Sequence, residues 1–77
     1  LDFNAVIVNL DSLPAEKQRA CLAEIQENID TLKAYLEQNI KEKEHEPSIP
    51  VTGMAVLHQQ YVLAEAIQTW INSLTKQ

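Results

Sequence analysis

Glycine, proline and cysteine are all scarce in this chain. Its 77 residues include one glycine, three prolines and one cysteine. So few turn-forming residues exclude the many tight turns that a β-sandwich or a β-barrel needs. A single cysteine excludes both a disulfide within the chain and a cysteine-rich zinc site.

Long apolar runs and positive charge are lacking as well. No apolar run approaches the roughly 20 residues that span a bilayer, and no signal peptide opens the sequence. Eleven Asp and Glu residues against six Lys and Arg residues give a net charge of -5, whereas contacts to nucleic acid phosphates need clustered Lys and Arg. We therefore predict a cytoplasmic protein with no membrane contact, in which these residues do not bind nucleic acid by themselves.

Apolar residues, in contrast, are plentiful. They make up 45% of the chain, which is too much for a disordered acidic tail. A chain of this length forms at most one domain with a marginal core, and such cores are usually completed by a partner. Because the sequence runs from Leu1 directly into an apolar pattern, we interpret residues 1–77 as a single helical domain of a longer protein.

The spacing of apolar residues predicts three helices and an all-α fold. They span residues 2–10, residues 14–43, and residues from 51 or 52 to 74. Pro47 and Pro50 interrupt the helical pattern between the two long helices. We expect a short helix followed by a long antiparallel helical hairpin, because the two long helices have similar lengths.

The two long helices differ in the width of their apolar face. The first carries a narrow, coiled-coil-like seam: Leu22, Ile25, Ile29, Leu32, Leu36 and Ile40. The second carries two adjacent stripes: Val56, Leu63, Ile67, Trp70 and Leu74 beside Met54, Leu57, Tyr61, Ala64 and Ile71. One partner helix covers only part of so wide an arc, and we therefore predict a twofold-symmetric homodimer that forms a dimeric helical bundle.

The last helix, which begins at residue 51 or 52 and ends at 74, supplies the residues of the predicted dimer interface. They are Leu57, Tyr61, Leu63, Ala64, Ile67, Trp70, Ile71 and Leu74. Aromatic side chains at such an interface can also stack on a flat, apolar effector. The candidate ligand-stacking residues are Trp70, Tyr61 and Phe3, with ordinary core packing as the alternative for each.

No pattern predicts catalysis, a cofactor or a metal. Glu42 and His45 form one Glu-x-x-His motif, whereas di-iron sites in helical bundles use two such motifs and further glutamates. His58 has no Ser or Cys near it in a recognisable nucleophile motif. Cys21 has no resolving partner except Cys21 of a second copy. We therefore expect that the chain is not an enzyme.

Two segments resemble the C-terminal region of PadR-like transcriptional regulators, of the type named after virulence activator alpha. Residues 3–16 are similar to its opening, in which a short apolar helix ends in a Leu-Pro-x-Glu turn, here at 13–16, before a long helix with regularly spaced leucines. Residues 65–74 are similar to its last helix, which bears a Trp, here Trp70. Thr69 stands where the family more often has an acidic residue.

The resemblance implies a role in transcription. Such regulators carry an N-terminal winged helix-turn-helix that binds operator DNA, and their helical C-terminal region dimerises. Some members bind small aromatic or drug-like molecules near the dimer interface, where a Trp matching Trp70 stacks on the ligand. No winged-helix pattern occurs in residues 1–77, so the resemblance implies that operator DNA would be bound only by an N-terminal domain outside them.

Two other classes of function remain open from the sequence. The chain is also compatible with a ligand-sensing fragment of another helical regulator, such as the TetR-like type. It is equally compatible with a helical module that binds another protein without any DNA. The sequence leaves the operator, the effector and the choice between activator and repressor undetermined.

Overall fold

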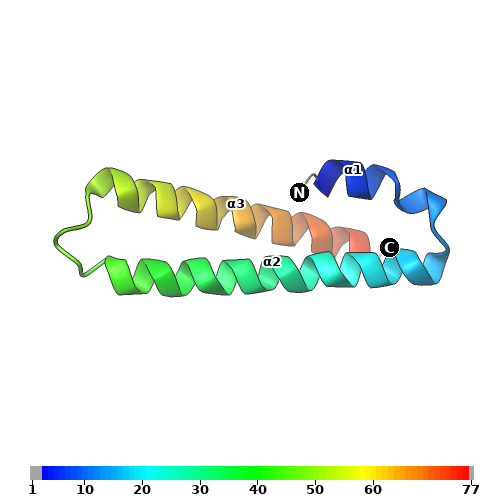
Figure 1. Cartoon of the computed structure of the whole chain (residues 1–77), viewed down its shortest axis with the longest axis horizontal. Helices are drawn as coiled ribbons and strands as arrows, with labels where there is room; N and C mark the ends of the chain where they lie inside the picture. The colour runs from blue at the N-terminus through cyan, green and yellow to red at the C-terminus, as the bar shows by residue number, and fades with distance from the viewer. Residues whose placement is uncertain (1–2, 77) are drawn as a thin grey trace.

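Two long antiparallel helices dominate the structure, a computed structural model that describes the backbone of residues 3–76 and the side chains of residues 4–76 (Figure 1). The elements in chain order are α1 (Phe3–Val8), the 3-10 turn η1 (Leu10–Ser12), α2 (Ala15–Lys43) and α3 (Val51–Thr75). Residues 3–76 contain no strand. The predicted all-α class and the packing of the two long helices against each other are thereby confirmed.

The first helix ends earlier than the predicted 2–10, at Val8, and its predicted start at Asp2 lies outside the described residues. The side chain of Asn9 donates to the carbonyl of Ala5 (2.8 Å), and the hydroxyl of Ser12 donates to the carbonyl of Asn9 (2.7 Å). Short polar side chains that bind nearby backbone groups in this way compete with continuation of a helix. The chain consequently tightens into η1.

Prolines set the starts of both long helices. The sequence predicts Pro14 as the first residue of the first long helix. In the structure, Pro14 has φ -57° and ψ 150° and is instead the cap that precedes α2. Its carbonyl accepts a hydrogen bond from the N–H of Gln18 at 3.0 Å. Pro50 caps α3 in the same way, with ψ 150°. Proline suits these positions because the first N–H groups of a helix have no intrahelical acceptor.

A small core lies between α2 and α3. Its central cluster consists of Ile29, Leu36 and Ala64, with Tyr61 and Ile67 packed against it. Ala64 allows the two helices to approach closely at this point because its side chain is a single methyl group. The other buried residues are Leu10, Ile25, Ile40 and Ile71.

Two residues of the predicted α2 seam lie outside this core: Leu22, which is half-buried, and Leu32. The side chain of Leu32 is 46% exposed, whereas Ile25, Ile29, Leu36 and Ile40 are buried. The narrow seam of α2 therefore faces α3 along one edge, and Leu32 stands beside it.

The molecule is a rod of 51 × 18 × 17 Å. Its radius of gyration is 15.7 Å, compared with about 11–12 Å for a compact domain of this length. Its accessible surface is 5755 Å², compared with about 4,700 Å² for a compact monomer of this mass. The hairpin therefore leaves about 1,000 Å² more surface in water than a compact fold would.

Candidate interaction surface

Polar side chains of α2 and α3 bind one another along one side of the hairpin, which we name the polar flank (Gln26, Asp30, Lys33, Glu65, Gln68 and Asn72). At its centre, the amide of Gln68 donates to the carboxylate of Asp30 at 2.7 Å and accepts from the ammonium of Lys33 at 2.9 Å. The amide nitrogen and the amide oxygen of one glutamine therefore connect α3 to two residues of α2.

Further contacts extend the polar flank in both directions. The ammonium of Lys33 lies 3.7 Å from the carboxylate of Glu65 and 5.6 Å from the centre of the Tyr61 ring. Toward the other end, the amide of Gln26 donates to the side-chain oxygen of Asn72. These bonds cross between the helices, so they fix the register in which α2 and α3 pack.

The other side of the hairpin, which we name the apolar flank, exposes large apolar side chains. It consists of Val56, Leu63 and Trp70 on α3 with Leu32 and Tyr35 on α2. The α3 residues recur at intervals of seven, which places them on one side of the helix. Their exposed fractions are 51% for Val56, 55% for Leu63 and 38% for Trp70.

Helix geometry places the two flanks on opposite sides. Leu63 and Gln68 are five residues apart, which corresponds to a rotation of about 140° at 3.6 residues per turn. On α2, Leu32 and Asp30 are two residues apart and about 160° from each other around the helix. Because Gln68 binds Asp30, these two residues lie on the same side of the hairpin. Leu63 and Leu32 therefore lie together on the opposite side.

The structure divides the predicted interface residues into three groups. Leu63 and Trp70 are exposed on the apolar flank. Four residues of α3 are half-buried: Leu57, Tyr61, Ile67 and Leu74. Ala64 and Ile71 are buried, at 2% and 0% exposure, within their own hairpin, so a partner molecule would not reach them without opening it.

The candidate ligand-stacking residues do not form one face. Tyr61 and Trp70 are nine residues apart, which corresponds to half a turn of rotation, about 180°. Tyr61 packs against the core cluster and under Lys33, whereas Trp70 belongs to the apolar flank. The side chain of Phe3 lies outside the described residues.

At the opposite end of the hairpin from the 44–50 loop, α1 and η1 pass the start of α2 and the end of α3 (Figure 1). Residues of all four elements line an open cavity there. Its volume is 620 Å³, within the range typical of small-molecule sites. The lining residues are Ile7, Leu10, Asp11, Ala15, Gln18, Arg19, Leu22, Ala23, Gln26, Leu74 and Thr75.

The cavity combines an apolar wall with two charged groups. Ile7, Leu22 and Leu74 supply apolar surface, and Asp11 and Arg19 supply one charge of each sign. No ion pair within 4.0 Å joins Asp11 to Arg19 among residues 3–76. The wall can therefore accommodate an apolar body, and the guanidinium of Arg19 can bind an anionic group.

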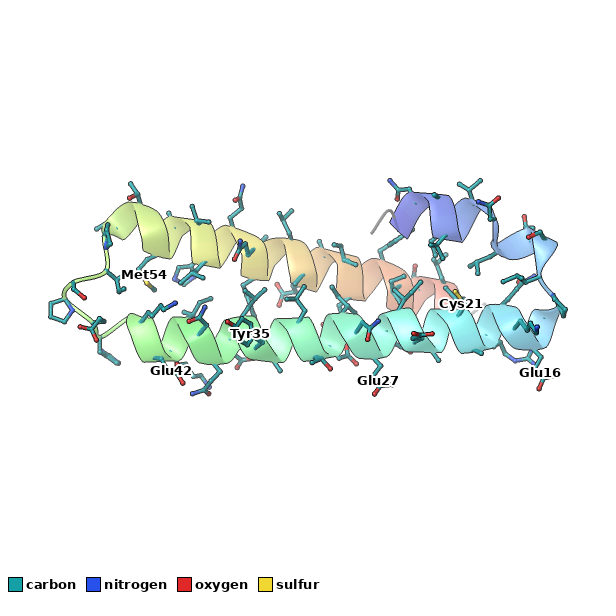
Figure 2. All side chains as sticks on the ribbon, viewed as in Figure 1. Glu16, Cys21, Glu27, Tyr35, Glu42 and Met54 are labelled. Carbon is teal, nitrogen blue, oxygen red and sulfur yellow. The ribbon has the colours of Figure 1, made fainter. Side chains whose placement is uncertain are left out.

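The other chemically active side chains lie apart from one another. His45 is 86% exposed beside Glu44 just after α2, His58 is exposed on α3, and Cys21 is half-buried on α2. Figure 2 shows Glu16, Glu27 and Glu42 projecting from the edge of α2 that faces away from α3. In the described part of the chain, no three His, Cys, Asp or Glu residues come together as metal ligands.

Two features of this surface had no clear signal in the sequence. The polar flank joins residues that are 32 to 46 positions apart, and their contact depends on the register of the hairpin. The cavity depends on the direction in which α1 folds back over α2. The seven-residue spacing of Val56, Leu63 and Trp70 was visible, and it identifies the apolar flank.

Comparison with known proteins adds no relative to these observations. Protein-family models, curated proteins and solved structures gave no significant match to the chain. Among residues 3–76, no helix has both the length and the hydropathy required to cross a membrane.

Proposed function

We propose that this chain is the C-terminal dimerisation and effector-sensing domain of a PadR-like, DNA-binding transcriptional regulator. The observation that carries the dimerisation part is the apolar flank, where Val56, Leu63 and Trp70 remain exposed after the hairpin has formed. The connection to transcription rests on the resemblance of residues 3–16 and 65–74 to that family.

The amount of surplus surface supports an association of this kind. A standard protein interface buries roughly 800 Å² per partner, and the rod exposes about 1,000 Å² more than a compact monomer of its mass. Transfer of apolar surface out of water contributes roughly 25 cal/mol per Å². A partner on the apolar flank would therefore provide the core that one hairpin lacks.

The charge distribution favours a second copy through α3. Two chains with a net charge of -5 repel each other, and α2 carries charged residues along its whole length. Glu65 is the one Asp, Glu, Lys or Arg residue of α3, and it is paired with Lys33 on the polar flank. Contact through the apolar flank of α3 brings the fewest like charges together.

Sedimentation equilibrium of the chain tests the proposed dimer. We expect a dimer at micromolar concentration, and we expect Leu63→Glu to produce a folded monomer, because Leu63 is more than half exposed in one hairpin. The matched control is Ala34→Glu, which adds the same charge at an exposed position of α2. A folded monomer from the unsubstituted chain would reject the proposal.

Trp70 provides an independent readout of the same association. It is the only Trp of the chain and lies on the apolar flank, so its environment becomes drier when a partner covers it. We expect its fluorescence emission to shift to shorter wavelength as the protein concentration rises. Leu63→Glu should abolish the shift, and Ala34→Glu should retain it.

A fusion assay tests whether the domain can organise DNA binding. Residues 1–77 are fused to a DNA-binding domain that represses a palindromic operator only as a dimer. We expect repression by the fusion, its loss with Leu63→Glu and its retention with Ala34→Glu. A well-expressed fusion without repression would argue for a module that serves another kind of assembly.

The sequence of the full-length protein distinguishes a transcriptional regulator from an interaction module that works without DNA. The regulator requires a winged helix-turn-helix in the same polypeptide, N-terminal to the helical domain. A full-length sequence with that pattern supports the proposal, and purified full-length protein should then shift an operator fragment in a gel. A parent without any such domain would reject the transcriptional role.

The cavity at the α1 end is the proposed effector site. Its volume and its apolar wall favour a small molecule, and Arg19 favours an anionic group on it. A panel of small aromatic acids, screened by thermal unfolding, should contain compounds that raise the melting temperature. Ala23→Trp, which fills the cavity, should abolish that rise, whereas Ala34→Trp on the outer side of α2 should retain it. An equal rise in both variants, or no rise with any compound, would reject the cavity as the effector site.

A further inference from the structure

We propose that the second copy docks with its α3 antiparallel to the first, about a twofold axis that passes beside Leu63. This inference rests on the proposed dimerisation and adds the geometry of the interface. The occupant of the apolar flank is then a second apolar flank. The surplus accessible surface of the rod and the scarcity of charged residues on α3 favour a copy of the same chain over a charged partner.

The position of Leu63 within α3 points to this axis. α3 runs from Val51 to Thr75, so Leu63 is its central residue. In an antiparallel pair centred there, Leu63 meets Leu63 of the partner copy, and Val56 meets Trp70. The three exposed α3 residues of the apolar flank are therefore mapped onto one another by a single twofold axis, as an isologous interface requires.

Side-chain size favours the antiparallel over the parallel arrangement. In a parallel pair, Trp70 would face Trp70 and Val56 would face Val56, which places two large groups at one end and two smaller groups at the other. In the antiparallel pair, the large Trp70 faces the smaller Val56 at both ends. Well-packed helix interfaces alternate large and small residues across facing positions.

The single charge of α3 is compatible with this axis. Glu65 is two residues from Leu63 and therefore about 160° from it around the helix. It points to the polar flank, where the ammonium of Lys33 lies 3.7 Å from its carboxylate. The contact between two α3 helices therefore leaves both Glu65 carboxylates outside the interface.

Disulfide trapping tests the arrangement. All variants carry Cys21→Ser, so that the native thiol does not interfere. We expect Leu63→Cys to form a disulfide-linked dimer under mild oxidation. Val56→Cys and Trp70→Cys should form one when they are mixed, but neither alone, because equivalent residues would be about 21 Å apart along the axis, far beyond the reach of a disulfide.

A second pair of variants covers the case in which loss of Trp70 impairs folding. Gln59 and Ile67 are related by the same axis, so Gln59→Cys mixed with Ile67→Cys should also give a linked dimer, whereas each alone should not. Ala34→Cys on the outer side of α2 is the control and should remain unlinked. Circular dichroism confirms that each variant is folded before it is oxidised.

The outcomes separate this inference from the proposed function. Linked dimers from Val56→Cys alone and from Trp70→Cys alone would show a parallel pair, which overturns the geometry and retains the dimer. Sedimentation as a dimer without any of these links would place the interface on another face. A monomer in sedimentation without links would reject both the geometry and the proposed function.

Discussion

The two flanks of the hairpin differ in whether their side chains find partners within the same chain. On the polar flank, Gln68, Lys33 and Asp30 satisfy one another within a single chain. On the apolar flank, Leu63 and Val56 remain more than half exposed. The polar flank therefore fixes how α2 and α3 pack, and the apolar flank is left available for a partner.

This difference separates the free energy of folding of one hairpin from the free energy of association between two hairpins. Contacts of the core and of the polar flank stabilise one hairpin, and their contribution does not depend on protein concentration. Contacts of the apolar flank contribute only when a second molecule is bound, so their contribution grows with concentration. The substitutions below test this separation, from the largest expected effect to the smallest.

Ile71→Ala should destabilise the hairpin most. Ile71 is fully buried, and truncation of such a residue typically costs about 2–5 kcal/mol. Urea unfolding followed by circular dichroism should show the loss at low and at high protein concentration. Leu63→Ala should lower stability only at high concentration, where the flank is covered. An equal cost of Leu63→Ala at both concentrations would contradict the separation of the flanks.

Gln68→Ala should have the largest effect on the polar flank. The variant loses hydrogen bonds to both Asp30 and Lys33, and such bonds contribute about 1–2 kcal/mol at partly exposed sites. We expect the same loss in urea unfolding at every protein concentration, and no change in the dimerisation constant from sedimentation. Gln60→Ala, at an exposed position of the same helix, is the matched control.

Gly53→Ala should stabilise the hairpin without affecting either flank. An added Cβ would meet the side chains of Ile49 and Pro50 at 3.8 and 3.9 Å, which are ordinary van der Waals distances. Replacing a helical glycine by alanine gains about 0.5–1 kcal/mol where the backbone allows it. Thermal unfolding should show the gain, and sedimentation should show an unchanged dimerisation constant. A weaker dimer would mean that the start of α3 also contributes to the interface.

Glu65→Gln should have the smallest effect. The Lys33–Glu65 pair is 3.7 Å long and half exposed on the Glu65 side, and pairs of this kind contribute about 0–1 kcal/mol. We expect urea unfolding at low salt to show a slight loss that disappears at high salt, because ions screen the pair. A loss that persists at high salt would mean that Glu65 has a second role on the polar flank.

The long helices were predictable because proline limits them. Pro14 and Pro50 precede α2 and α3, and the predicted bounds of both helices agree with the structure to within one residue. The end of α1 was not predictable from apolar spacing, since Leu10 continues the pattern. There the side chains of Asn9 and Ser12 decide the outcome by binding backbone carbonyls.

The candidate surface was predictable in part. The sequence showed two apolar stripes on α3 but not which of them faces α2. The structure buries Ala64 and Ile71 of one stripe and exposes Val56, Leu63 and Trp70 of the other, although Ile67 of that second stripe packs against the core. Both stripes are equally apolar, so the choice depends on cross-helix partners such as Gln68, which is adjacent to the buried stripe and binds Asp30.

The end of the rod at which α1 lies has a consequence for the spacing of a symmetric pair. Leu74, near the end of α3, lines the same cavity as Ile7 of α1. In the proposed antiparallel pair, the two Leu74 residues are separated by about 33 Å along the axis. The two α1 cavities of such a dimer would therefore lie far apart, on either side of the twofold axis, so each copy would take up its own effector.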